Sequence, residues 1–185
     1  MELDYPNGLF YYDDFVDDKT AMELKDFIDG EPWDKSLSRR VQHYGHRYSY
    51  KYAQMKYDYV VKPVPDIFLS IFKKIKEINH IITCDQNNLQ VIVNEYNPGQ
   101  GISAHTDDTN QFGEWVVGVS LLSPVEMEFS KSSKVIKVLL KPNSLYIMTG
   151  ESRYQWKHEI KPKLYNNDSK RDRRISLTFR YKRQK

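Results

Sequence analysis

The second half of the chain is a series of short apolar segments that alternate with turns. The segments that fit extended strands are 89–96, 115–122, 125–130, 135–140, 144–149 and 174–181. Pro98-Gly99, Ser123-Pro124 and Pro142-Asn143 supply chain breaks between them. Several short strands in succession, without helices between them, favour a β-sandwich or jelly-roll over a sheet built from alternating strands and helices.

Two helices are expected before this strand-rich half. Residues 17–29 carry apolar side chains at helical spacing, with Asp17 as a possible N-cap and Gly30 as the stop. Residues 66–80 carry a clearer apolar stripe and follow Pro65, which suits the start of a helix. Helices followed by strands predict an α+β fold, in which N-terminal helices pack on a double-stranded β-helix, or jelly-roll, core.

Length and composition restrict the class of protein further. A chain of 185 residues without internal repeats or low-complexity linkers is expected to be one domain, 1–185, with its jelly-roll core at 89–181. No apolar run approaches the roughly 20 residues of a membrane span, so no membrane association is expected. The single cysteine, Cys84, excludes an intramolecular disulfide and a cysteine-built zinc site. Because the N-terminus also lacks a signal-peptide pattern, we expect an intracellular location, cytoplasmic or nuclear. We also expect a monomer.

The segment 39–59 has an unusual composition, with six tyrosines, two histidines and five Lys/Arg. Its alternation predicts extended structure or a hairpin. Aromatic rings stack on bases and cations contact phosphates, so a nucleotide-recognition lid is one interpretation. The alternative is an ordinary hairpin whose tyrosines cover the sheet.

Positive charge is concentrated at the C-terminus. Residues 161–185 hold ten Lys/Arg and two Asp, a local charge of +8, so the rest of a chain of net charge +3 carries −5. This asymmetry indicates either a nucleic-acid partner or simply a solvated, charge-rich segment.

Two histidines and one aspartate have the composition of a metal site. His105 and Asp107 are two residues apart and therefore share one face of an extended segment. His158 lies 53 residues further on, where a neighbouring strand could return it to the same place. Two histidines and one carboxylate form the facial triad of non-haem Fe(II) oxygenases. The alternative for His105 and Asp107 is a turn with a solvated pair.

Such an iron centre needs a chelating cosubstrate, and two further strands carry groups that suit 2-oxoglutarate. Alternation in 174–181 places Arg174 and Arg180 on one face, and arginine matches a carboxylate bidentately. Asn94 and Tyr96 likewise share one face of 89–96 and could hydrogen-bond a bound dicarboxylate.

Taken in order, Asn94-x-Tyr96, Pro98-Gly99, His105-x-Asp107, His158 and Arg174-x5-Arg180 resemble the AlkB family of nucleic-acid-directed dioxygenases. The resemblance implies that His105, Asp107 and His158 bind Fe(II), with 2-oxoglutarate and O₂ as cosubstrates. It further implies that Arg174 and Tyr96 bind the distal carboxylate of 2-oxoglutarate and that Asn94 contacts it nearer the iron. Ser176 stands where some relatives carry a cosubstrate-contacting Asn, and Arg180 matches an arginine that braces the metal site near Asp107. Glu159 departs from the family, in which Gly often follows the metal-binding histidine.

Three segments resemble the AlkB branch that hydroxylates wobble uridines in tRNA: 93–102, 148–158 and 40–45. The expected function is therefore oxidation of a nucleic acid, with hydroxylation of a modified wobble uridine in tRNA. The residues expected to bind this substrate are Arg40, His43, Tyr44, Arg47 and Tyr48. The RNA-recognition and methyltransferase domains fused to animal members of that branch are absent from this sequence, so a separate RNA-binding or methyltransferase partner protein is a further expectation.

Three other functions remain open on the sequence alone. The same metal chemistry could demethylate alkylated bases in DNA or RNA, releasing formaldehyde, or could act on lysine or methyl-lysine in a protein. A binding module without activity is the alternative outside the enzymes.

Overall fold

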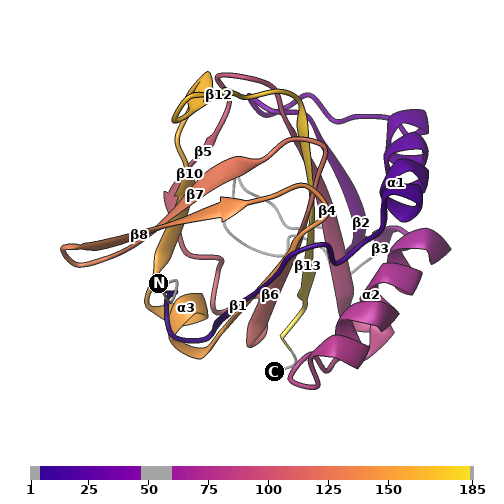
Figure 1. Ribbon diagram of the computed structural model, residues 1–185. Helices are drawn as coiled ribbons and strands as arrows, with labels where there is room; N and C mark the ends of the chain where they lie inside the picture. Colours follow the sequence, from indigo (N-terminus) through magenta and orange to yellow (C-terminus); the bar gives the residue numbers. More distant parts are fainter. Residues whose placement is uncertain (1–4, 47–59, 184–185) are drawn as a thin grey trace.

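Two β-sheets face each other, and two helices cover the outer face of the larger sheet (Figure 1). The structure is a computed structural model that describes residues 5–46 and 60–183. The larger sheet has the order β1 (Leu9–Tyr12), β9 (Leu145–Thr149), β6 (Trp115–Leu121), β13 (Arg174–Tyr181), β4 (Leu89–Tyr96), β2 (Val41–His46) and β3 (Val60–Lys62). The smaller sheet has the order β5 (Ile102–His105), β10 (Lys157–Ile160), β7 (Val125–Lys131) and β8 (Lys134–Leu140). The remaining elements are α1 (Asp18–Gly30), α2 (Asp66–Ile78), the 3-10 turn Gln86–Asn88, α3 (Gly150–Tyr154), and the short pair β11 (Tyr165–Asn166) and β12 (Ser169–Lys170).

This architecture confirms the predicted α+β fold with a jelly-roll core. Both predicted helices form, and Asp17 caps α1 by accepting a hydrogen bond from the Thr20 amide at 2.7 Å. All six predicted strands form within a residue of their expected bounds. The prediction missed β5 and β10, which are short and polar and carry no clear alternation. Among the described residues, no helix is long and apolar enough to cross a membrane.

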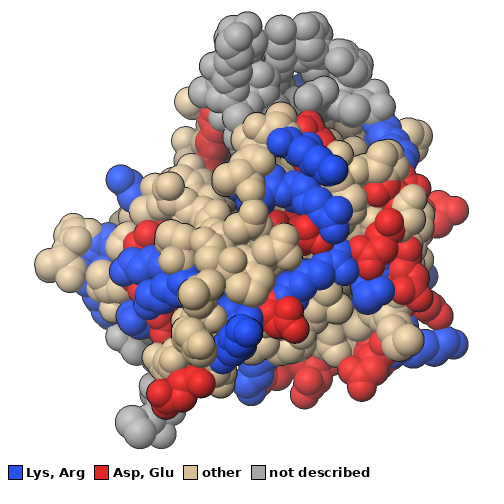
Figure 2. All heavy atoms as spheres, turned by 90° about the horizontal axis from the view of Figure 1, so that it is seen from above, with Lys and Arg blue, Asp and Glu red and all other residues tan. Residues whose placement is uncertain are grey.

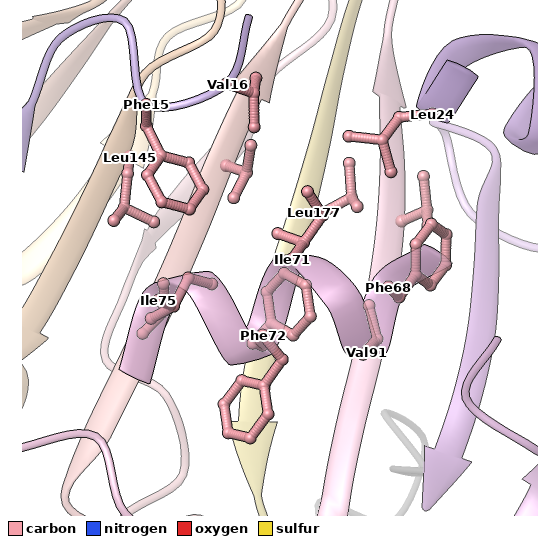
Figure 3. Packing of buried hydrophobic residues seen from close by; sticks show 14 of the residues in the cluster. Phe15, Val16, Leu24, Phe68, Ile71, Phe72, Ile75, Val91, Leu145 and Leu177 are labelled. Atoms are coloured by element: carbon pink, nitrogen blue, oxygen red, sulfur yellow. The ribbon is translucent and has the colours of Figure 1, made fainter. Parts of the chain in front are cut away.

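Helix α2 anchors the core on the outer face of the larger sheet. Its buried residues Phe68, Ile71, Phe72 and Ile75 recur at helical spacing and point toward Val91 of β4 and other strand residues (Figure 3). Burying each such side chain contributes about 1.5–3 kcal/mol.

A second apolar cluster lies between the two sheets. It joins Val116 and Tyr146 of the larger sheet to Met127, Phe129 and Ile160 of the smaller one. Strand β4 is therefore covered on both faces and is buried at all eight positions. In β13 the apolar side chains face the helices, so Arg174, Ser176 and Arg180 face the space between the sheets.

The first part of the segment 39–59, which the sequence predicts as a lid, is built into the larger sheet. Residues 41–46 are β2, an internal strand of the larger sheet that pairs with β4 on one side and β3 on the other. Backbone hydrogen bonds to two neighbours hold this segment in the sheet, in agreement with the extended structure or hairpin that its alternation predicts. Residues 47–59 lie outside the described part of the chain.

Candidate metal and cosubstrate site

The pairing of β5 with β10 brings the three predicted metal ligands together. His105 at the end of β5 is the direct antiparallel partner of His158 in β10, and the two ring centroids are 4.3 Å apart. Asp107 follows β5 by two residues, and its Oδ2 lies 3.7 Å from Nε2 of His158. One ligand atom from each residue lies within 4.8 Å of the others, so the three can hold one metal ion. Two imidazoles and one carboxylate are a donor set that suits Fe(II).

Local electrostatics keep Asp107 and His158 in their metal-binding protonation states. Burial by itself would raise the pKa of Asp107, but the neighbouring Arg180, to which it is hydrogen-bonded, helps to bring it down to about 2. Burial lowers the pKa of His158 to about 4, so this imidazole is neutral near pH 7. Nδ1 of His105 lies 2.8 Å from the Ser103 carbonyl, which can only accept, so this contact favours the tautomer in which Nε2 is the metal-binding atom.

Arg153 in α3 supports the loop that carries Asp107, a role that the sequence did not reveal. Its side chain is 1% exposed and donates to the backbone carbonyls of Asp107 at 2.8 Å and of Asp108 at 3.3 Å. The helix that follows β9 thereby fixes the position of a metal-binding residue 46 positions earlier in the chain.

A cavity of about 490 Å³ opens next to the three ligands, between the two sheets. Arg174 lines this cavity. The residue is 2% exposed, and its Nε donates a hydrogen bond to Ser120 Oγ at 2.9 Å. Its Nη1 and Nη2 are buried without a hydrogen-bond partner among the described residues. A buried guanidinium with two free donors needs an anion, and a carboxylate of 2-oxoglutarate would supply one. The cavity therefore fits both the metal and the cosubstrate.

The other predicted cosubstrate residues line the same cavity. Asn94 is the cross-strand partner of Ser176, and Tyr96 is that of Arg174. The Arg174 guanidinium lies 5.4 Å from the centroid of the Tyr96 ring. Tyr146 also lines the cavity, and burial raises its pKa to about 12, so its phenol stays neutral as a possible donor.

Two predicted substrate-binding residues lie elsewhere. Arg40 donates to the buried Glu95 carboxylate and packs 4.6 Å from the Trp33 ring, on the helix side of the sheet. Tyr44 is 1% exposed and meets the Phe68 ring edge-on at 5.2 Å, so it is a core residue. The register of β2 on β4 turns Gln42 and Tyr44 toward the helices, so neither Arg40 nor Tyr44 lines the cavity.

The remaining members of that set are His43, Arg47 and Tyr48. His43 faces the cavity side of the sheet, since its cross-strand partner Ile92 lines the cavity. Arg47 and Tyr48 lie outside the described residues. Arg39, which the sequence did not single out as a site residue, lines the cavity instead of Arg40.

Several cations of the basic C-terminal segment are paired within the protein. Arg171 donates to Asn166 and to the Lys161 carbonyl, Arg173 pairs with Asp29 and Glu95, and Arg180 pairs with Asp107. The lysines at 161 and 163 form ion pairs with Glu128 and Glu126. Part of the local charge of +8 therefore has a partner within the fold, while Lys161, Lys163, Lys170 and Arg183 are exposed.

Comparison with known proteins agrees with this fold and site. A model of the 2OG-Fe(II) oxygenase superfamily matches residues 17–180. An uncharacterised protein of Acanthamoeba polyphaga mimivirus is 34% identical over 184 residues, which cover 94% of this chain and 84% of that protein. The tRNA (carboxymethyluridine(34)-5-O)-methyltransferase of Xenopus tropicalis is 34% identical over 170 residues, but these span 87% of this chain and only 26% of that protein. The solved structure of OsALKBH1 has the same fold, with a TM-score of 0.71 at 19% identity over 96% of this chain and 97% of that one.

The fold, the ligand triad and the matched superfamily define the class of protein: the chain belongs to the 2OG-Fe(II) oxygenase superfamily, dioxygenases that use Fe(II) and 2-oxoglutarate. Within that superfamily it is an AlkB-family dioxygenase.

Proposed function

We propose that this dioxygenase acts on a nucleic acid and hydroxylates a modified uridine at the wobble position of a tRNA. One observation carries the proposal. The chain that builds the triad and the Arg174 cavity shares 34% identity, over 87% of its length, with a relative whose name refers to carboxymethyluridine at tRNA position 34. Bases in an anticodon loop are already splayed, so such a substrate need not be flipped out of a duplex.

In this proposal each cavity residue has a defined task. His105, Asp107 and His158 hold the iron, and Arg180 keeps Asp107 ionised. Arg174, with Tyr96 beside it, binds the distal carboxylate of 2-oxoglutarate, while Asn94 and Ser176 line the wall between that carboxylate and the metal.

Bound Fe(II) and 2-oxoglutarate supply the oxidation, in which one atom of O₂ enters succinate as CO₂ is lost and the other enters a C–H bond of the substrate. A carbon side chain on uridine would keep the new hydroxyl group. An N-methyl group would lose formaldehyde after the same step, so the substrate determines whether the result is modification or demethylation.

Three arginines of the C-terminal segment, Arg171, Arg173 and Arg180, are engaged within the fold, so fewer of its cations are available to contact tRNA than the sequence count suggests. His43, on the cavity side of β2, is the one member of the predicted substrate-binding set that is both described and consistent with that role. We also propose a separate RNA-binding or methyltransferase partner protein as a source of affinity.

The test is incubation of the iron-loaded protein and 2-oxoglutarate with tRNA that carries 5-methoxycarbonylmethyluridine, followed by nucleoside mass spectrometry. The proposal predicts a gain of one oxygen on that nucleoside and none with an Asp107→Ala variant. Absence of this product, together with efficient removal of methyl groups from alkylated DNA or RNA, would assign the protein to demethylation instead.

A further inference from the structure

Arg39 reaches into the cosubstrate cavity from a short loop at its mouth. The loop spans residues 35–40 and is closed by a two-way backbone pairing of Asp34 with Val41, at 2.8 and 2.9 Å. Gln100 ties the loop to the neighbouring turn by donating to the Ser38 carbonyl at 2.6 Å. Arg39 is half-buried, and these contacts hold its backbone in place.

The Arg39 side chain contacts two residues that line the cavity. Its Nε donates to Asn94 Oδ1 at 2.9 Å. Its guanidinium carbon lies 5.7 Å from the centroid of the Tyr96 ring, which Arg174 also approaches, at 5.4 Å. The Tyr96 ring is thus in contact with both Arg39 and Arg174.

The hydrogen bond to Asn94 has a directional consequence. An arginine can only donate, whereas a primary amide has one accepting oxygen and one donating nitrogen. With Oδ1 held by Arg39, the Asn94 NH₂ group is turned away from the loop. No described residue accepts a hydrogen bond from it, and Asn94 is 6% exposed at the cavity wall. A flipped amide would present its oxygen to an incoming carboxylate and repel it.

We propose that Arg39 is a positioning residue for 2-oxoglutarate: it fixes the Asn94 amide so that the NH₂ group donates to a cosubstrate carboxylate. This inference rests on the use of 2-oxoglutarate by the family and not on the identity of the substrate. The inference about Arg39 can therefore fail while the tRNA proposal stands, and the tRNA proposal can fail while the inference about Arg39 stands.

Two substitutions of equal length separate this role from direct binding by the Arg39 charge. Arg39→Gln places an NH₂ donor at the same number of bonds from the backbone as the arginine Nε, without the charge. Arg39→Met has similar length and no donor. The readout is the dissociation constant of 2-oxoglutarate for the Mn(II)-loaded protein, measured by calorimetry, with Mn(II) affinity measured separately.

The proposal predicts that Arg39→Gln stays within about threefold of the native dissociation constant, whereas Arg39→Met weakens binding about tenfold, the cost of a lost hydrogen bond to a charged ligand. Lys35→Met, an exposed cation in the same loop, should leave the constant unchanged. In an Asn94→Ala background, Arg39→Met should cause no further loss, because the effect acts through Asn94.

Three results would overturn the proposal. A tenfold loss in Arg39→Gln would show that the charge itself binds the cosubstrate. If the Arg39→Met variant bound 2-oxoglutarate with native affinity, Arg39 would have no role in binding this cosubstrate. If Arg39→Met weakened 2-oxoglutarate binding tenfold in the Asn94→Ala background as well, Arg39 would act independently of the Asn94 amide.

Discussion

At the scale of single residues, the cavity is defined by charges whose burial would be unfavourable without partners. Asp107 is 8% exposed and pairs with Arg180, whereas Arg174 is 2% exposed and has two donors without a partner in residues 5–46 and 60–183. The protein itself supplies the counter-charge for Asp107, whereas a ligand has to supply the counter-charge for Arg174.

The Arg174→Met variant should therefore bind 2-oxoglutarate at least about tenfold more weakly, since a hydrogen bond to a charged group contributes about 1.5–3 kcal/mol. The measurement is the 2-oxoglutarate requirement for succinate formation. An unchanged requirement would mean that another cation, with Arg180 on the same strand face as the first candidate, binds the distal carboxylate.

Arg153→Met should lower the affinity for Mn(II) about tenfold, because groups that orient metal ligands typically contribute 10–100-fold to binding. Electron paramagnetic resonance of free Mn(II) gives the dissociation constant, with the exposed Lys157→Met as the matched control. Equal affinity in the two variants would show that the Asp107 loop holds its shape without Arg153.

The residues that could be predicted from sequence are those whose chemistry restricts them. Two histidines and an aspartate at this spacing indicate a metal, and paired arginines on a strand indicate an anion. Arg153 could not be predicted, because its partners are backbone carbonyls, which have no sequence signature. The choice between Arg39 and Arg40 depends on which side of the loop each faces, which neighbouring positions do not reveal.

At the scale of elements, long strands were predictable and the role of β2 was not. Strands β4 and β13 carry strong patterns and formed at their expected bounds. The aromatic, basic sequence around β2 fits both an exposed hairpin and an internal strand, and only its pairing with β4 decides between them. Tyr44 consequently belongs to the packing of α2 and not to a substrate surface.

Tyr44→Ala should lower the free energy of unfolding by about 3–5 kcal/mol, as for other large aromatic residues removed from a core. Urea unfolding followed by circular dichroism measures this change. A loss below about 1 kcal/mol, the usual range for exposed positions, would contradict the core assignment and restore Tyr44 as a surface candidate.

At the scale of the whole molecule, the surface charge differs from what a count along the sequence suggests. Basic and acidic side chains are interspersed over the face seen in Figure 2, without a single continuous basic field. A sequence count registers ten Lys/Arg in 161–185, but it cannot register that Arg171, Arg173 and Arg180 have partners inside the fold.

Binding of tRNA should accordingly weaken with salt, but less steeply than ten phosphate contacts would require. Ten contacts to single-stranded RNA correspond to a slope of about −7 in log affinity against log salt, and we expect a slope shallower than about −4. Fluorescence anisotropy of labelled tRNA over a salt series gives this slope. A value near −7 would mean that the C-terminal charges leave their internal partners on binding, and no tRNA binding at low salt would favour a protein substrate.

The most direct measurement of the central claim is an anaerobic titration of the protein with Fe(II) and 2-oxoglutarate, followed by visible absorption. If His105, Asp107 and His158 hold the metal beside Arg174, an absorption band should appear only when both components are present. The band should be lost in Asp107→Ala and should require more 2-oxoglutarate in Arg174→Met. A native protein that gives no such band, or an Asp107→Ala variant that gives the native band, would contradict the assignment of this cavity as the iron and 2-oxoglutarate site.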